Sequence, residues 1–212
     1  MKKSAPVSKR SIVPPMTGGH YTRFLSSTYD FLTKLSGWRR KIAIHALDDL
    51  PASGKLLDIG CGTGFLLHLA SKNGYEVHGV EPSQGMLKKA FENYSFRPDQ
   101  ITQAEAHQIP LPSESFDIIT ASGSLIYMMR IQETASEISR LLKRNGFLRI
   151  IDHAVPFEPN WTTPFITLFS QLTGEIIHDY PTIFEKDFNL ISKKTLGRGG
   201  YLQQFDFVKR SY

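Results

Sequence analysis

We predict an α/β protein with a doubly wound parallel sheet for this chain of 212 residues. From residue 55 onward, short apolar runs alternate with longer amphipathic runs, which is the pattern of strands alternating with helices. A glycine-rich turn over residues 60–64 joins the first strand-like run to the first helix-like run. Near the end of the chain, two β-rich runs flank a glycine cluster at 197–200. This arrangement predicts an antiparallel hairpin that completes the sheet.

The first 50 residues precede the predicted sheet. Residues 1–19 are rich in Pro, Ser, Gly and Lys and have no apolar periodicity, so we expect a flexible basic arm. Residues 20–50 have a helical pattern in two pieces that are separated near Ser36, and Pro51 ends the second piece. We therefore expect an N-terminal helical extension that is part of a single domain over residues 20–212.

The later elements follow from local patterns. Ser83 is a suitable N-cap for the helix after the second strand, and Asn145-Gly146 is a typical helix stop. In chain order the predicted strands cover residues 55–59, 75–80, 100–104, 116–121, 147–151, 188–196 and 201–210. The predicted helices cover 63–73, 83–93 and 132–144, followed by a short helix that begins at Thr163-Pro164 and ends at Gly174.

Basic residues are unevenly distributed along the chain. The chain contains 25 Lys or Arg and 20 Asp or Glu, for a net charge of +5. Residues 1–41 contain nine Lys or Arg and one acid, a net charge of +8, so the rest of the chain has a net charge of −3. Such a segment can contact an anionic membrane or nucleic acid, or it can be a solvated tail. We expect at most weak membrane contact and no nucleic-acid partner.

Several other classes are disfavoured by the sequence. No apolar run approaches the roughly 20 residues that span a bilayer, and the N-terminus lacks the apolar centre of a signal peptide. Cys61 is the single cysteine, which excludes an internal disulfide. The seven histidines are scattered and form no H-E-x-x-H motif, so we expect no metal. The expected location is the cytoplasm, with room for a peripheral position at the inner face of a membrane.

The glycine-rich turn contains the most informative motif. Residues 58–64 have the pattern D-x-G-x-G-x-G directly after an apolar run. The dinucleotide pattern G-x-G-x-x-G fails, because its third glycine would fall at Phe65. The segment instead resembles the first motif of class I S-adenosylmethionine (SAM) methyltransferases. In that family the loop packs against the methionine and ribose parts of SAM, and the carboxylate helps to orient the ammonium group.

Three further segments are similar to the same family, in the same order. Residues 81–90 are similar to the pattern of an acid, then Ser, then Met-Leu and Ala, and Glu81 lies where a carboxylate accepts the ribose hydroxyls. Residues 104–117 resemble the G-D-A-x-x-L-P-F segment and its S-F-D, with Glu105 in place of the usual Asp. Residues 137–143 resemble the E-I-x-R-x-L-K helix. The resemblance covers roughly residues 40–155 and points to methyltransferases of type 11, which include quinone- and phospholipid-methyltransferase-like enzymes.

The resemblance implies a fold, a cofactor and a cofactor site. The implied fold is a single Rossmann-like domain with a seven-stranded, mostly parallel sheet, helices on both faces and a C-terminal antiparallel hairpin. The implied cofactor is SAM, which leaves as S-adenosylhomocysteine, and Pro82 and Met86 would pack on its adenine. The residues assigned to the cofactor are Asp58, Gly60, Cys61, Gly62, Gly64, Glu81, Pro82, Met86, Glu105, Ala106 and Ser122.

The acceptor side has weaker signals. His153 follows a predicted central strand, where open α/β sheets bind ligands, and a histidine there resembles phospholipid N-methyltransferases. Tyr29-Asp30 resembles the entry segment of quinone C-methyltransferases. We expect His153, Tyr21 and Tyr127 to act at the acceptor, and His178 is a further candidate. The alternative for His153 is a structural histidine at the edge of the core.

These observations predict methyl transfer from SAM to a small, moderately apolar acceptor that is quinone-, lipid- or metabolite-like. Two alternatives remain open at this stage. One is a non-catalytic binding protein with the SAM fold, and the other is an RNA methyltransferase that uses the basic N-terminal arm. The sequence leaves the oligomeric state undetermined.

Overall fold

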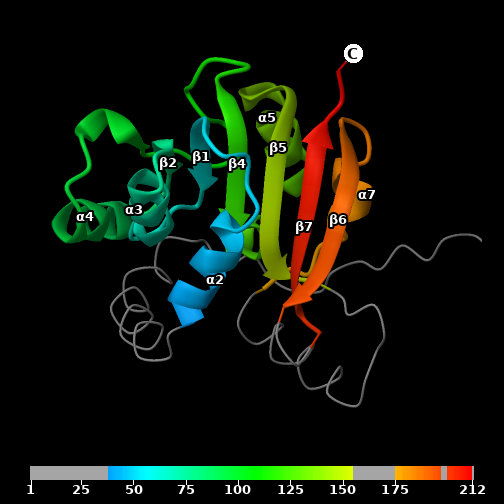
Figure 1. Ribbon diagram of the computed structural model, residues 1–212, viewed down its shortest axis with the longest axis horizontal. Coiled ribbons are helices and arrows are strands. Elements are labelled where there is room, and N and C mark those ends of the chain that lie inside the picture. The colour runs from blue at the N-terminus through cyan, green and yellow to red at the C-terminus, as the bar shows by residue number, and fades with distance from the viewer. Residues whose placement is uncertain (1–37, 155–174, 197–199, 212) are drawn as a thin grey trace, which may run out of the picture.

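The computed structural model describes residues 38–154, 175–196 and 200–211. Its centre is a seven-stranded sheet with the order β3-β2-β1-β4-β5-β7-β6 (Figure 1). Strands β3, β2, β1, β4 and β5 are parallel, whereas β7 is antiparallel to both of its neighbours. In chain order the strands are β1 Lys55–Ile59, β2 Glu76–Val80, β3 Ile101–Thr102, β4 Phe116–Ser122, β5 Leu142–His153, β6 Phe188–Leu196 and β7 Leu202–Lys209.

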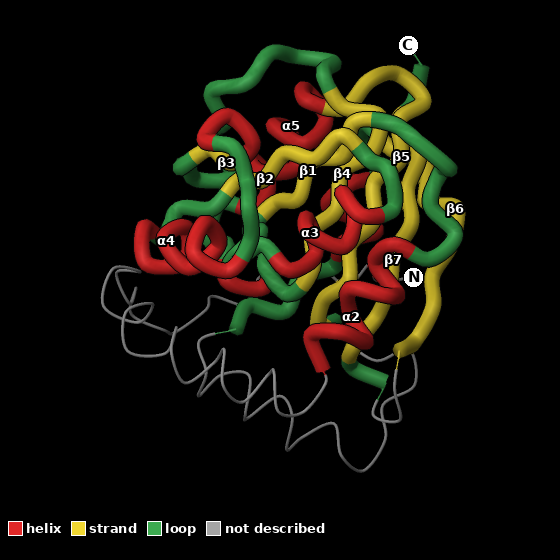
Figure 2. The backbone as a smooth tube through the Cα atoms, turned by 60° about the vertical axis from the view of Figure 1, so that its left-hand side comes forward, coloured by secondary structure: helices red, strands yellow, loops and turns green. Residues whose placement is uncertain are grey.

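Helices cover both faces of the sheet (Figures 1 and 2). One face carries α2 (Trp38–Leu47), α3 (Phe65–Lys72) and α4 (Gln84–Asn93), whose buried residues share one apolar cluster. The other face carries α5 (Ile131–Leu141) and α7 (Tyr180–Phe184), which pack in a second cluster. Both clusters are formed by alternate residues of the central strands, as expected for a sheet that is buried on its two faces.

The predicted architecture is confirmed. The sheet has seven strands, it is mostly parallel, and β7 and β6 form the antiparallel end. Strand β1 has the predicted bounds, and α4 begins after Ser83, whose side chain accepts a hydrogen bond from the Met86 amide. The predicted third strand, 100–104, is shorter in the structure and covers Ile101–Thr102. The predicted helix that ends at Gly174, and the first of the two N-terminal helical pieces, lie outside the described residues.

The predicted helix 132–144 is wrong at its C-terminal end. Helix α5 ends at Leu141, and strand β5 begins at Leu142. Leu142 is fully buried and pairs with Phe116 of β4. Sheet pairing therefore makes a strand of residues whose apolar period predicts a helix. Asn145 has a left-handed conformation (φ 57°) and lies where the pairing of β5 with β4 is irregular. Asn and Gly favour this conformation both at such an irregularity and at the end of a helix, so the sequence pattern is the same for both. Helix α7 was not predicted, because its five residues are too short for a recognisable period.

The described helices are all too short or too polar to cross a bilayer. Two 3₁₀ turns complete the described structure, Pro98–Gln100 before β3 and η2 (Leu125–Tyr127) after β4. The η2 turn lies beside the C-terminal end of β5, because Asp152 accepts a hydrogen bond from the Ile126 amide at 3.2 Å. The C-terminal ends of β1, β2, β4 and β5 therefore meet at one edge of the sheet, which we call the carboxyl edge.

Candidate active site

The glycine loop after β1 is tightly held on two sides and open at its centre. Gly60, Gly62 and Gly64 all have positive φ angles, 71°, 56° and 79°. A Cβ atom on Gly60 would lie 2.5 Å from Ser124, and a Cβ on Gly64 would lie 2.6 Å from the Phe96 ring. Among the described residues, a Cβ on Gly62 would meet no atom within 4 Å. The loop thus presents bare backbone at Gly62 to open space, which is the geometry that a closely packed ligand needs.

Glu81 lies at the end of β2 and faces this opening. Its carboxylate accepts hydrogen bonds from the amides of Gly62 at 3.0 Å and Ser83 at 2.9 Å. Burial raises the pKa of Glu81, whereas these two amide bonds lower it, and the charge of Glu105 raises it further. The carboxylate still has unused lone pairs, because each oxygen can accept two hydrogen bonds. A ligand hydroxyl can therefore bind Glu81 without displacing the loop.

Asp58 lies beneath the glycine loop and is only 3% exposed. The Thr120 hydroxyl donates a 2.8 Å hydrogen bond to its Oδ1 atom. Burial raises the pKa of Asp58 to about 7, the Thr120 bond opposes this shift, and the nearby charge of Glu81 adds to it. The Asp58 carboxyl group is therefore only partly ionised near neutrality, and a cationic ligand would favour its charged form.

The other predicted cofactor residues surround the opening with different exposures. Cys61 is buried, burial raises the pKa of its thiol, and the sulfur lies against Gly79 of β2, where a Cβ would approach it to 2.7 Å. Pro82 and Glu105 are exposed, Met86 is partly buried, and Ala106 is buried. The Gln103 side chain donates to the Pro82 carbonyl at 3.2 Å. The segments that follow β2 and β3 thus lie next to each other at the carboxyl edge.

The turn after β4 closes the site on the other side. Ser124 donates a hydrogen bond to the Ile59 carbonyl at 2.7 Å, which fixes this turn to the end of β1. Ser122, at the end of β4, has a buried hydroxyl oxygen with no hydrogen-bond partner. Tyr127 lies in η2 and is half exposed. The turn after β4 is therefore joined to the end of β1 beside the opening.

His153 ends β5 at the carboxyl edge. Its Nδ1 lies 3.0 Å from Oε2 of Glu175. This contact raises the pKa of the imidazole above its usual value. Burial of the ring lowers the pKa, and the charge of Asp152 raises it. His178 is buried and packs edge-on against the Tyr180 ring, with 5.8 Å between ring centroids. Tyr21 and Tyr29 lie outside the described residues.

Three supporting residues were not predicted from the sequence, namely Thr120, Ser124 and Glu175. Thr120 had only the pattern of a strand residue, and Ser124 belonged to a turn without a motif. Glu175 directly follows Gly174, and the residues around it form no sequence motif that would indicate a role. Their partners are 62, 65 and 22 residues away in sequence, so only the folded chain reveals them.

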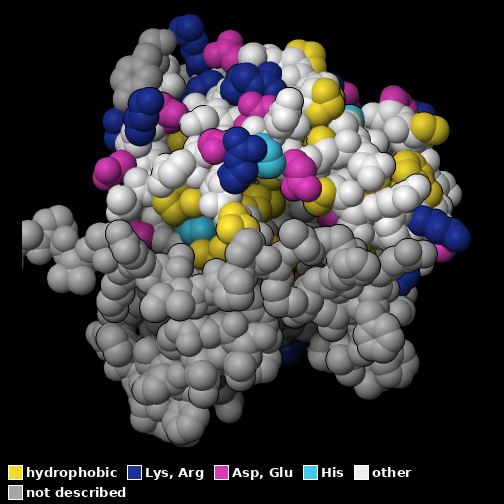
Figure 3. Space-filling view, turned by 180° about the vertical axis from the view of Figure 1, so that it is seen from behind, with side chains coloured by type: hydrophobic (Ala, Val, Ile, Leu, Met, Phe, Trp, Pro, Cys, Tyr) yellow, Lys and Arg dark blue, Asp and Glu magenta, His cyan; other side chains and the backbone are white. Residues whose placement is uncertain are grey.

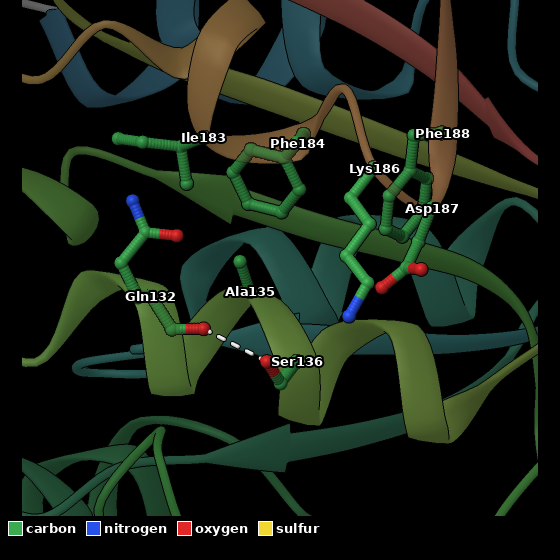
Figure 4. A pocket seen from close by; sticks show the side chains of 8 residues that line it. All are labelled: Gln132, Ala135, Ser136, Ile183, Phe184, Lys186, Asp187 and Phe188. Atoms are coloured by element: carbon green, nitrogen blue, oxygen red, sulfur yellow. Dashed lines mark hydrogen bonds between the residues drawn. The ribbon is translucent and has the colours of Figure 1, made fainter.

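A small cleft occurs elsewhere, between α5 and the turn from α7 to β6 (Figure 4). Its volume is about 60 Å³, and Gln132, Phe184 and Lys186 are among its lining residues. Phe188 pairs with Lys209 at the end of β7, and the neighbouring Val208 pairs with Phe147 in the first half of β5, so this cleft lies at the end of the sheet opposite the glycine loop. Ligand pockets are usually about 300–1,000 Å³, so the cleft has room only for a few water molecules.

No cluster of three or more potential metal ligands occurs among the residues that the structure describes. At the carboxyl edge the structure brings together the glycine loop, the carboxylates of Asp58 and Glu81, and the His153–Glu175 pair. Carboxylate oxygens beside a bare loop backbone can accept hydrogen bonds from the hydroxyl or ammonium groups of a ligand.

Comparison with known proteins agrees with this geometry. Residues 57–150 match the family model described as a methyltransferase domain. The chain is 30% identical over 137 residues to the ubiquinone/menaquinone biosynthesis C-methyltransferase UbiE of Campylobacter jejuni, covering 61% of this chain and 56% of that protein. It is 29% identical over 161 residues to the demethylmenaquinone methyltransferase of Desulfitobacterium hafniense, covering 70% and 63%. The chain thus spans little more than half the length of the curated relatives it matches.

Solved structures share the fold at low sequence identity. The methyltransferase in a Haloferax volcanii complex with the Trm112 methyltransferase activator superposes with a TM-score of 0.74 at 16% identity, covering 91% of this chain and 99% of that one. A SAM-dependent methyltransferase of Thermotoga maritima gives 0.71 at 17% identity, covering 91% and 99%. The chain thus has the fold of these SAM-dependent methyltransferases. Residues 57–150, somewhat less than half of the chain, match the methyltransferase domain family, whose type 11 members the sequence resembles.

Proposed function

We propose that this protein transfers a methyl group from SAM to a small, moderately apolar acceptor. The observation that carries the proposal is the opening at Gly62, which Asp58 and Glu81 flank within the matched methyltransferase domain. A glycine whose missing Cβ faces open space, beside two inward carboxylates, suits a ligand with hydroxyl and ammonium groups. SAM has both.

In this proposal each part of the opening binds one part of SAM. The loop backbone at 60–64, with Cys61 as a packing residue, lies against the methionine and ribose, and Asp58 faces the ammonium group. Glu81 accepts the ribose hydroxyls, and Pro82 and Met86 pack on the adenine. Glu105 and the Ala106 amide bind the edge of the adenine, and Ser122 supplies its unpartnered hydroxyl to the methionine end.

The acceptor would lie at the end of β5, where His153 is accessible. Two relatives are named for methylation of quinone precursors, which supports an aromatic, apolar acceptor for this chain. Tyr127 and Tyr21 are the proposed aromatic contacts, and His153 is the proposed base or orienting group. The basic residues 1–41 support an additional weak contact with an anionic membrane, from which an apolar acceptor could be drawn.

The test combines binding and turnover. Calorimetry with the full chain should show SAM binding and negligible NAD binding. Incubation with methyl-labelled SAM and 1,4-naphthoquinol should yield a labelled product. Glu81→Ala should weaken SAM binding by about 1.5–3 kcal/mol, the range for a hydrogen bond to a charged group.

Glu76→Ala is the matched control, because Glu76 lies at the exposed start of the same strand. Equal SAM affinity of wild type and Glu81→Ala would contradict the proposed cofactor site. SAM binding without labelled product, from the quinol and from a cell extract alike, would instead favour a non-catalytic binding protein.

A further inference from the structure

Two residues that are distant in sequence form a contact at the acceptor side of the site. Nδ1 of His153 and Oε2 of Glu175 are 3.0 Å apart. The Ile176 amide donates to the Ile126 carbonyl at 2.7 Å, so the backbone next to Glu175 is fixed beside η2. The backbone next to Glu175 is therefore held near the end of β5, within reach of the His153 ring.

The two side chains differ in their access to solvent. The His153 side chain is 32% exposed, whereas the Glu175 side chain is 7% exposed. Among the described residues, no hydrogen bond occupies Nε2 of His153. The carboxylate is thus the buried partner of the pair, and the more exposed ring keeps a second nitrogen for another molecule.

This geometry selects one form of the neutral imidazole. A carboxylate at Nδ1 is an acceptor only, so the proton must lie on Nδ1 and the lone pair on Nε2. The same arrangement, a histidine base held by a carboxylate, orients the base in many enzymes of unrelated fold. A histidine that only filled the core edge would need no buried carboxylate behind it.

The charged groups around His153 are few. Among the described residues, Glu175 and Asp152 are the two that act on its ring. Asp152 lies on the opposite face of β5, where it accepts hydrogen bonds from the amides of His153 and Ile126. Asp152 therefore holds backbone, and Glu175 alone bonds to the imidazole.

We propose that Glu175 is the positioning residue of His153, and that the pair removes a proton from a weakly acidic hydroxyl group of a phenol-like acceptor. This inference rests on the proposed methyl transfer and specifies its acceptor. The O–H bond of the acceptor breaks, and its proton moves to Nε2. The electron pair that is released, on oxygen or on a conjugated ring carbon, attacks the methyl carbon of SAM.

The remaining bonds balance without another reactant. The carbon–sulfur bond breaks, its electrons return to sulfur, and S-adenosylhomocysteine forms. His153 then passes its proton to water. If ring carbon is methylated, the proton of that carbon is lost and the hydroxyl is regained, so either route releases one proton in total.

The first experiment measures the ring directly and needs no acceptor. In ¹⁵N-labelled full-length protein, NMR titration should show His153 with its proton on Nδ1 and a pKa above the usual 6.5. Glu175→Gln should lower this pKa and mix the two tautomers, and Glu175→Asp should restore most of the wild-type behaviour. Glu185→Gln, an exposed change at the end of α7, is the control. Identical titrations in wild type and Glu175→Gln would overturn the pairing.

The second experiment measures turnover of 1,4-naphthoquinol with methyl-labelled SAM. Glu175→Gln should lower kcat by about tenfold or more, and His153→Gln by about a hundredfold or more, as losses of general-base catalysis do. The acidic limb of the kcat profile should move to lower pH in Glu175→Gln, and SAM affinity should stay unchanged in both variants.

The outcomes separate this inference from the proposed function. Absence of SAM binding in the wild type would overturn both. Normal SAM binding with normal turnover in Glu175→Gln would overturn only the role of Glu175. Methylation of an amine probe such as phosphoethanolamine, with none of the naphthoquinol, would overturn the phenol-like acceptor.

Discussion

At the scale of single residues, Asp58 should make the proposed cofactor site sensitive to pH. Its pKa is raised to about 7 by burial, so the proposed partner of the SAM ammonium group is partly protonated at neutrality. Because SAM should bind the charged carboxylate, its affinity should rise by up to about tenfold per pH unit below pH 7 and level off above it. Calorimetry between pH 5.5 and 7.5 checks this, and a profile of Asp58→Asn as steep as that of the wild type would contradict it.

The same shift affects stability in the absence of SAM. The folded-state pKa of Asp58 lies above its usual 3.8, so the native state binds the proton more tightly than the unfolded chain. The contribution of Asp58 is therefore fully present below about pH 4 and is lost as the pH rises toward 7. Chemical denaturation at several pH values should show this decline in the free energy of unfolding. In Asp58→Asn the decline with pH should be smaller, because Asn does not titrate.

Gly62 offers a test that separates binding from folding. Its φ angle is 56°, and a Cβ there would meet no protein atom within 4 Å. Gly62→Ala should therefore cost only about 1–2 kcal/mol of stability, the strain of a left-handed alanine. It should weaken SAM binding by a further 1–3 kcal/mol or so, because the methyl group would occupy ligand space.

Gly74→Ala is the matched control, because Gly74 also has a positive φ (90°) and open space around it but lies before β2, at the far edge of the sheet. Calorimetry and thermal unfolding of the two variants make the comparison. Normal SAM affinity in Gly62→Ala would place the cofactor elsewhere.

At the scale of elements, helix α2 is held to the sheet by a buried charge. Arg149 of β5 is 1% exposed and forms a two-point ion pair with Asp206 of β7, at 2.7 and 2.9 Å. The same guanidinium donates to the carbonyls of His45 and Asp48 at the end of α2. Carbonyl groups at the end of a helix have no partner within the helix, and here Arg149, about 100 residues later in the chain, donates hydrogen bonds to two of them.

Removing this cation should be costly. Arg149→Met leaves Asp206 charged and buried, which should lower the free energy of unfolding by about 3–5 kcal/mol. The double variant Arg149→Met/Asp206→Leu should recover part of that loss, because no charge is then left without a partner. Urea denaturation measures both, and Arg97→Ala, at an exposed ion pair, should change little. Equal stability of Arg149→Met and wild type would show that α2 is held by its apolar contacts alone.

At the scale of the whole molecule, positive charge is concentrated before the sheet. The described face in Figure 3 carries Lys, Arg, Asp and Glu intermixed, whereas residues 1–41 have a net charge of +8. A segment of this charge should be attracted to anionic lipid by about 1 kcal/mol per basic residue near the surface.

Deletion of residues 1–19 removes four of the nine basic residues. It should weaken binding to vesicles that contain phosphatidylglycerol, and binding of the full chain should fall as salt rises from 50 to 500 mM or so, since screening shortens the reach of exposed charges. Sedimentation with vesicles measures this, with neutral phosphatidylcholine vesicles as the control. Steeply salt-dependent binding to RNA, with none to vesicles, would favour the RNA methyltransferase instead.

The sequence by itself determined the features that depend on neighbouring residues. Strand β1 was predicted with its observed bounds, because glycines end its apolar run on both sides. The D-x-G-x-G-x-G pattern predicted the loop, and the two β-rich runs around Gly197–Gly200 predicted the antiparallel pair of β6 and β7. In each case the conformation is set by local backbone preference and side-chain period, which act over a few residues.

Tertiary structure decided where α5 gives way to β5, and which distant side chains meet. Leu142 fits a helix by period, but its pairing with Phe116 makes it a strand residue. The contacts of Thr120 with Asp58 and of Glu175 with His153 join segments 62 and 22 positions apart. Such contacts are decided by how the sheet and its helices pack, because a buried polar group takes whatever partner the folded chain brings within hydrogen-bond distance, and no local pattern encodes that partner.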